Sequence, residues 1–134
     1  MSAAERRIQV RRSDRCFRLR PGELAQAPRR PGVYEFLAYG RKGEPEVLYV
    51  GLALERTLYD HIADHLMGNL RPSVPELRRA HEEVFFDFLE AADGSADDLK
   101  DIAGELMIRH NPRHNLLQNP PSSGRHRKIT LMEL

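Results

Sequence analysis

The sequence has one cysteine and no long hydrophobic run. Cys16 has no partner for a disulfide within the chain, and a thiolate metal site is not expected without a second cysteine beside it. We interpret Cys16 as a small apolar residue in a strand. No stretch approaches the roughly eighteen apolar residues of a transmembrane helix, and MSAAERRIQV carries charges where a signal peptide needs apolar side chains. These absences predict a soluble, intracellular protein of the cytoplasm with no membrane contact.

Internal repeats and long low-complexity segments are also lacking. The longest biased stretch is NPPSSG at 119–124, which is typical of a turn or linker. With 134 residues and 40% hydrophobic content, the chain can form one domain around a single modest core. We therefore expect one functional site.

Charge is distributed unevenly along the chain, although the net charge is only +1. Residues 1–30 carry nine arginines against three acidic residues (+6), whereas residues 31–115 carry nine basic against sixteen acidic residues (−7). Residues 116–134 carry three basic residues against one acidic residue (+2). Basic ends can bind phosphate backbones, because each neutralised phosphate releases a counterion. They can equally be solvated tails, or arms that pack on the protein's own acidic surface.

Three strands are predicted between residues 31 and 115. β-Branched and aromatic residues predict a strand at 32–39, which a turn at 40–45 joins to a second strand at 47–50 in an antiparallel hairpin. Residues 84–89 are almost all apolar, which predicts a third strand at the centre of the sheet, buried on both faces.

Three helices are predicted between and after these strands. Leu54, Leu58, Ile62 and Leu66 recur at helical spacing and end near Gly68. A short helix runs from Ser73 through His81, and a third begins at a capping box of Ser95 with Asp98 and stops near Asn111. On the third helix, Asp98, Asp101, Glu105 and Arg109 form a polar stripe that is expected to face solvent.

The order of these elements predicts a small three-stranded mixed sheet flanked by helices, in the α+β or α/β class. RIQVRR and CFRLRP near the front are expected to be short strands or an ordered arm. We divide the chain into a basic N-terminal arm (1–27), a domain (28–118) and a basic C-terminal tail (119–134).

The hairpin contains two short motifs, Pro31-Gly32-Val33-Tyr34 and Leu48-Tyr49-Val50-Gly51. They resemble the paired motif of the GIY-YIG nuclease family, with valine in place of isoleucine in both. Asn111-Pro112-Arg113-His114-Asn115 is similar to the K-P-x-Y-N segment that closes the domain in the family's repair endonucleases. The resemblance covers roughly residues 28–117.

Strand alternation places the two tyrosines of this motif near each other. Tyr34 lies on one face with Phe36, and Tyr49 on one face with Gly51, so the two phenols can meet across the hairpin. Gly51 has no side chain, which allows the backbone either to turn into the helix or to approach a ligand closely. Both tyrosines can instead be half-buried aromatics with a solvated hydroxyl, which is common in strands. We predict that they converge on a partly open pocket beside His61.

The resemblance implies that a tyrosine helps to activate the attacking water, an arginine on the first helix stabilises the phosphate, and a later glutamate binds one divalent metal. The catalytic candidates are accordingly Tyr34, Tyr49 and His61, since His61 stands where the family has its arginine. Imidazole lacks the donor fork of arginine and is only partly charged near neutral pH. Arg56 at the helix start can substitute for it or can be a solvated charge.

The metal position departs from the family. Counting back from Asn115, the family's glutamate falls at Ala103, which cannot bind magnesium and is expected to face the tyrosines. Asp101 and Glu105 lie two residues away and therefore about 200° round the helix. Glu105 is the metal candidate if the helix is realigned.

The remaining candidates are Gly32, Gly51, His65 and Asn115, taken as substrate-binding or structural. Asn115 corresponds to the family's structural asparagine, which implies that it satisfies backbone groups near the site, or it is a turn residue. His61 and His65 share a helix face and can hold a transition metal, although no third ligand is evident.

Two functions follow from these patterns. The first is a DNA endonuclease that uses Mg²⁺ or Mn²⁺ to hydrolyse phosphodiester bonds, as in DNA repair. The second is an inactive nuclease-like domain without a cofactor, which binds nucleic acid or a larger nucleoprotein assembly through its basic arms. In both cases the expected partner is nucleic acid, most simply DNA, with no small-molecule cofactor.

Overall fold

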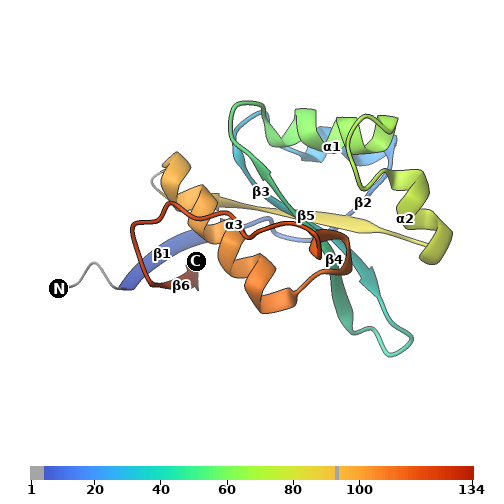
Figure 1. Cartoon of the computed structure of the whole chain (residues 1–134). Coiled ribbons are helices and arrows are strands. Elements are labelled where there is room, and N and C mark those ends of the chain that lie inside the picture. The colour runs from blue at the N-terminus through green and yellow to red at the C-terminus, as the bar shows by residue number, and fades with distance from the viewer. Residues whose placement is uncertain (1–4, 93) are drawn as a thin grey trace.

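The computed structural model describes residues 5–92 and 94–134, which form a mixed sheet with helices on both faces (Figure 1). The strands are β1 (Glu5–Arg12), β2 (Phe17–Arg18), β3 (Gly32–Tyr39), β4 (Pro45–Ala53), β5 (Phe85–Ala91) and β6 (Lys128–Glu133). Their order is β4-β3-β5-β1-β6, with β2 paired to β5. The β1–β6 pair is parallel and the other pairs are antiparallel.

The predicted hairpin and central strand are both present. β3 and β4 pair antiparallel, and β5 lies between β3 and β1. The predicted sheet of three strands is smaller than the observed sheet, because β1, β2 and β6 also belong to it. In β1, alternation buries Ile8 and Val10 while the neighbouring positions stay outside the core, so the basic segment is a strand of the sheet.

Helices α1 (Leu58–Met67), α2 (Val74–Ala80) and α3 (Ala96–His110) correspond to the three predicted helices. The predicted start of the first helix at Leu54 is wrong, because Thr57 and Asp60 form a capping box that starts the helix at Leu58. Leu54 packs against the core outside the helix. Short 3₁₀ segments, η2 (Pro21–Gln26) and η3 (Arg113–Asn115), complete the elements.

The two faces of the sheet carry separate cores. The first core combines side chains of β3, β4 and β5 with α1 and α2, and includes Tyr34, Phe36, Tyr49, Ile62, Leu77 and Phe86. The second core combines the alternate strand positions with α3, and includes Val33, Val50, Leu89, Ile102, Ala103 and Leu106. The neighbours Val33 and Tyr34 of β3 thus belong to different cores, as strand alternation requires.

The polar stripe of α3 differs from the prediction, because Asp98 and Asp101 are buried. The chain after η3 runs along α3 before it enters β6 (Figure 1). Asp98 accepts hydrogen bonds from Arg6 (3.1 Å) and Arg125 (3.2 Å), and Asp101 accepts two from Ser123 (both 2.8 Å). Periodicity could not show this, since the cover comes from a segment distant in sequence. Both basic ends therefore contact acidic groups of the domain itself.

Membrane-spanning helices were also sought. Within residues 5–92 and 94–134, no helix combines the length and the apolar character needed to cross a membrane.

Candidate functional site

The Tyr34 hydroxyl is fixed by two histidines of α1. The hydroxyl oxygen lies 2.7 Å from Nε2 of His65 and 3.2 Å from Nδ1 of His61, and the Tyr34 side chain is completely buried. Nδ1 of His65 lies 2.8 Å from the carbonyl oxygen of Pro72. Because a carbonyl only accepts, His65 donates from Nδ1 and accepts the Tyr34 proton at Nε2. His61 must then donate to the phenol oxygen.

Burial keeps these three groups neutral near pH 7. It raises the pKa of Tyr34 well above the ordinary value of 10.0, and it lowers the pKa of His65 from 6.5 to about 4. The pKa of His61 is also lowered, first by burial and then by the charge of Arg56. His61 is therefore a poorer cation than a free imidazole. It supplies neither the permanent charge nor the donor fork of the arginine that the family resemblance led us to expect at this position.

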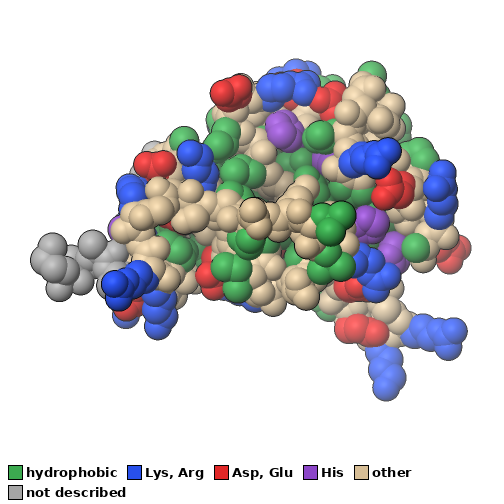
Figure 2. All heavy atoms as spheres, in the orientation of Figure 1, with side chains coloured by type: hydrophobic (Ala, Val, Ile, Leu, Met, Phe, Trp, Pro, Cys, Tyr) green, Lys and Arg blue, Asp and Glu red, His purple; other side chains and the backbone are tan. Residues whose placement is uncertain are grey.

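The two tyrosines converge, but the site is closed. Their ring centroids are 6.1 Å apart, and both belong to the first core. The expectation of a partly open pocket is wrong for Tyr34, which has 0% exposure, and Tyr49 has only 8%. Burial raises the pKa of Tyr49, and hydrogen bonds to Tyr34 and Gln118 oppose this rise. Figure 2 shows histidine side chains at the surface of this side of the molecule, over α1 and towards α2.

Close packing explains why glycine occupies positions 32 and 51 of the two motifs. Gly51 is directly opposite Tyr34 in the hairpin, and a Cβ on Gly51 would lie 2.0 Å from Cζ of Tyr34. The absent side chain therefore admits the tyrosine ring rather than a ligand. A Cβ on Gly32 would lie 2.7 Å from Cδ1 of Leu58, where α1 begins against the sheet.

Asn115 clamps the second half of the motif. Its Oδ1 accepts from the Val50 amide (2.8 Å), and its Nδ2 donates to the Val50 carbonyl (3.0 Å) and to Oε1 of Gln118 (2.7 Å). Asn115 is 4% exposed. The amide thus satisfies both backbone groups of a buried residue between Tyr49 and Gly51.

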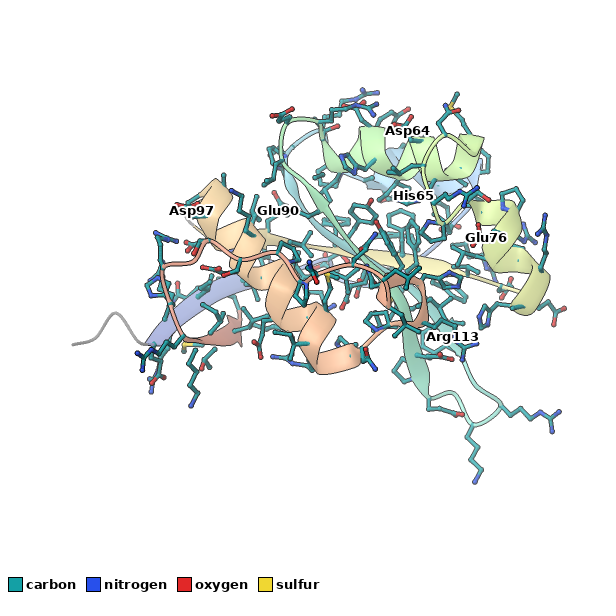
Figure 3. The ribbon with its side chains drawn as sticks, in the orientation of Figure 1. Asp64, His65, Glu76, Glu90, Asp97 and Arg113 are labelled. Atoms are coloured by element: carbon teal, nitrogen blue, oxygen red, sulfur yellow. The ribbon has the colours of Figure 1, made fainter. Side chains whose placement is uncertain are left out.

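Arg56 does not reach the tyrosines. Its guanidinium pairs with the carboxylate of Asp64, and its side chain is 55% exposed. Figure 3 shows Asp64 at the outer side of α1 and His65 directed towards the sheet. The solvent-facing alternative for Arg56 is thus the one observed, and its charge contributes to the lowered pKa of His61.

The position of the expected metal ligand lies in the second core. Ala103 is 1% exposed and packs there, so the expectation that it faces the tyrosines of the first core is wrong. Glu105 is half-buried on α3, and Asp101 is bound by Ser123. Within the described residues, no group of three or more histidine, cysteine, aspartate or glutamate side chains is arranged to hold a metal. This donor set does not fit Mg²⁺ or Mn²⁺, which prefer clustered carboxylate oxygens.

A second buried polar cluster, which we call the carboxylate pair, was not predicted. Glu35 on β3 and Asp87 on β5 are directly opposed in the sheet and are 1% and 3% exposed. Nη1 of Arg12 donates to Oε1 of Glu35 (2.5 Å) and Oδ2 of Asp87 (2.7 Å), while its Nε donates to Glu133 (2.7 Å). Nε2 of His110 lies 3.8 Å from Oε2 of Glu35.

Two oxygens of the carboxylate pair, Oε2 of Glu35 and Oδ1 of Asp87, are buried and have no hydrogen-bond partner among the described residues. Burial and the charge of Glu35 raise the pKa of Asp87 from 3.8 to about 7. The sequence did carry a signal: single acids interrupt the otherwise apolar stretches VYEFL and FFDFL.

Cys16 also differs from the prediction. It precedes β2 instead of lying in a strand, and it is half-buried. Its Sγ lies 4.0 Å from Oδ2 of Asp87, and burial raises its thiol pKa. A raised pKa disfavours the thiolate, so Cys16 is not an activated nucleophile.

The basic N-terminal segment lines an open groove of about 660 Å³, which we call the arginine groove. Its lining is Arg11, Arg12, Ser13, Asp14, Arg15, Phe17, Gln26, Phe88 and Glu90. The sequence predicted a basic arm but not that β2 and β5 would place the aromatic rings of Phe17 and Phe88 beside it.

Comparison of the chain with protein-family models, with curated proteins and with solved structures found no match in any of the three.

Proposed function

We propose that this protein is a GIY-YIG-related domain that binds nucleic acid and lacks metal-dependent nuclease activity. The observation that carries the proposal is the enclosure of Tyr34. Its hydroxyl is buried, hydrogen-bonded to His65 and His61, and has a pKa raised well above 10.0. A phenol held in this way cannot meet and activate a water molecule at a phosphodiester.

The other groups required for hydrolysis are also unsuited to it. Phosphodiester cleavage in this family needs a cation near phosphorus and a metal that acts as a Lewis acid. His61 has a lowered pKa, and Ala103 is a core residue without a ligand atom. The motif residues instead act as a packing unit: Gly51 admits Tyr34, and Asn115 secures Val50.

Binding of nucleic acid is supported by the placement of charge. The acidic middle of the chain (−7) should repel phosphate, whereas β1 and the following loop present Arg11 and Arg15 at the arginine groove. We therefore assign binding to this segment. The partner is DNA or RNA, free or within a larger nucleoprotein assembly.

Deletion of residues 1–20 cannot test this assignment, because it would remove β1 and β2 from the sheet. The test combines binding and cleavage measurements on the full chain. Labelled branched, flapped, duplex and single-stranded substrates are incubated with Mg²⁺ or Mn²⁺ and compared with metal-free samples. We expect salt-dependent binding without product formation.

Tyr34→Phe and Glu105→Ala are the diagnostic variants, with circular dichroism as the folding control. Metal-dependent cleavage that Glu105→Ala abolishes while the fold persists would identify Glu105 as a ligand and the protein as a nuclease. Absence of binding to every substrate would refute the binding function itself.

A further inference from the structure

The floor of the arginine groove is aromatic. Phe17 and Phe88 lie nearly parallel, with an interplanar angle of 10° and ring centroids 6.3 Å apart. The guanidinium carbon of Arg15 lies 5.4 Å from the centroid of Phe17. Phe17 is buried to 8% exposure, whereas Phe88 is only partly buried. Phe88 is therefore the ring that a ligand in the groove can contact.

The charge at the groove comes from two arginines. Arg12 is committed to Glu35, Asp87 and Glu133, and Glu90 is bound by both Nε and Nη2 of Arg30 (2.8 and 3.0 Å).

Within residues 5–92 and 94–134, Arg11 and Arg15 form no ion pair, and Asp14 is the one acid in the lining without a basic partner. The groove is thus complementary to an anion.

The loop that carries Arg15 is held against the strand that carries Phe88. The Ser13 amide donates to the Phe88 carbonyl (2.8 Å), and the Phe88 amide donates to the Ser13 hydroxyl (3.3 Å). The same hydroxyl donates to the carbonyl of Arg15 (3.0 Å). These bonds fix the backbone between cation and ring, so little ordering is required when a ligand binds.

We infer that the arginine groove binds single-stranded nucleic acid, with an unpaired base against Phe88 and the adjoining phosphates at Arg11 and Arg15. This inference rests on the proposed nucleic-acid function and specifies its substrate. A base in a duplex has both faces stacked on its neighbours, whereas a single strand offers its base faces to an aromatic side chain. The volume of 660 Å³ lies within the range of about 300–1,000 Å³ for pockets that enclose small ligands.

The experiment measures fluorescence anisotropy of labelled single-stranded DNA, single-stranded RNA and duplex DNA of equal length, across a series of salt concentrations. We expect tighter binding of a single strand than of the duplex. The DNA and RNA samples show which sugar is accepted.

Arg11→Gln and Arg15→Gln should each weaken single-strand binding several-fold and reduce the magnitude of the slope of log K against log salt by about 0.7. Arg41→Gln is the matched control, because Arg41 is an exposed arginine of the acidic segment, in the β3–β4 turn, and should change neither quantity.

Phe88→Leu should weaken binding about ten-fold or more without altering the salt slope, because it removes stacking and not charge. Since Phe88 packs on Phe17, thermal melting checks that this variant folds. Ultraviolet cross-linking of the wild-type complex gives a second readout and should label Phe88, the ring of the groove that is only partly buried.

The outcomes separate this inference from the function on which it rests. Equal or tighter binding of the duplex, with unchanged affinity in folded Phe88→Leu and cross-links elsewhere, would overturn the single-strand inference while leaving nucleic-acid binding intact. Failure to bind any of the three nucleic acids would overturn both.

Discussion

Each face of the sheet carries one buried polar cluster, and the two clusters differ in electrostatic character. The cluster of Tyr34, His61 and His65 in the first core is neutral, and each of its hydrogen-bond donors has an acceptor. The carboxylate pair on the second face is bound by the charged guanidinium of Arg12, and two of its buried oxygens have no hydrogen-bond partner in the described parts of the chain. The motif residues therefore form the cluster without buried charge. The stronger electrostatic interactions are those of residues outside the motif.

This contrast changes the meaning of the motif resemblance. A glycine opposite a tyrosine, and an asparagine that bonds to a strand backbone, are requirements of packing, so these residues do not by themselves indicate catalysis. The carboxylate pair instead needs a specific cation, since two opposed buried carboxylates repel each other. The comparison can be tested by removing the key partner of each cluster.

The largest effect is expected for Arg12→Met. Removing the guanidinium leaves Glu35 and Asp87 opposed without a cation, which should lower the free energy of unfolding by about 3–5 kcal/mol at pH 7. The loss should be smaller at pH 5, because protonation of the pair relieves the repulsion. Urea denaturation at the two pH values measures it.

Arg11→Met is the matched control for this loss. Arg11 is exposed and forms no ion pair within the described parts of the chain, so its replacement should change the free energy of unfolding by no more than about 0.5 kcal/mol. Equal losses in the two variants would mean that the carboxylate pair does not depend on Arg12.

Much of the first cluster could be predicted from the sequence, because its geometry is local. Alternation in one hairpin fixes the faces of Tyr34 and Tyr49, and the helical spacing of His61 and His65 places both on one side of α1. Enclosure of Tyr34 was not predictable in this way, since it depends on side chains contributed by several elements.

The second face could not be predicted, because its partners are distant in sequence. Arg12 and Glu133 are 121 residues apart and meet only because β6 pairs in parallel with β1. The burial of Asp98 likewise depends on Arg125. Periodicity within one segment identifies an amphipathic face but not the segment that later covers it.

A smaller effect is expected for Tyr34→Phe. The substitution keeps the ring against Gly51 but leaves Nε2 of His65 buried without a donor, which should cost about 1–3 kcal/mol of the free energy of unfolding. Tyr59→Phe is the control: Tyr59 is half-buried, its ring lies 3.9 Å from the guanidinium carbon of Arg29, and that contact survives the change. Both variants are measured by denaturant unfolding. The same small loss of unfolding free energy in both would contradict a stabilising hydrogen bond from Tyr34 to His65.

The smallest effects, measured as the change in the free energy of unfolding per pH unit, are expected from titration of the two clusters. The two changes should have opposite signs. The folded pKa of His65, about 4, lies below its ordinary 6.5, so its contribution to stability is present above pH 6.5 and is lost as pH falls towards 4. The folded pKa of Asp87, about 7, lies above its ordinary 3.8, so its contribution is present below pH 3.8 and is lost as pH rises through 7. Between pH 4 and 6.5 the two contributions therefore change in opposite directions.

Asp87→Asn and His65→Gln should separate these contributions when each is compared with the wild type by urea unfolding from pH 4.5 to 6.5. Relative to the wild type, Asp87→Asn should become more stable as pH rises and His65→Gln less stable, each by no more than about 1.4 kcal/mol per pH unit. In the difference between a variant and the wild type, the contributions of the titratable groups that both proteins contain cancel. Asp14→Asn, at an exposed carboxylate, is the control and should keep the wild-type profile. If both variants shifted in the same direction, the two clusters would not have the opposite electrostatic character assigned to them.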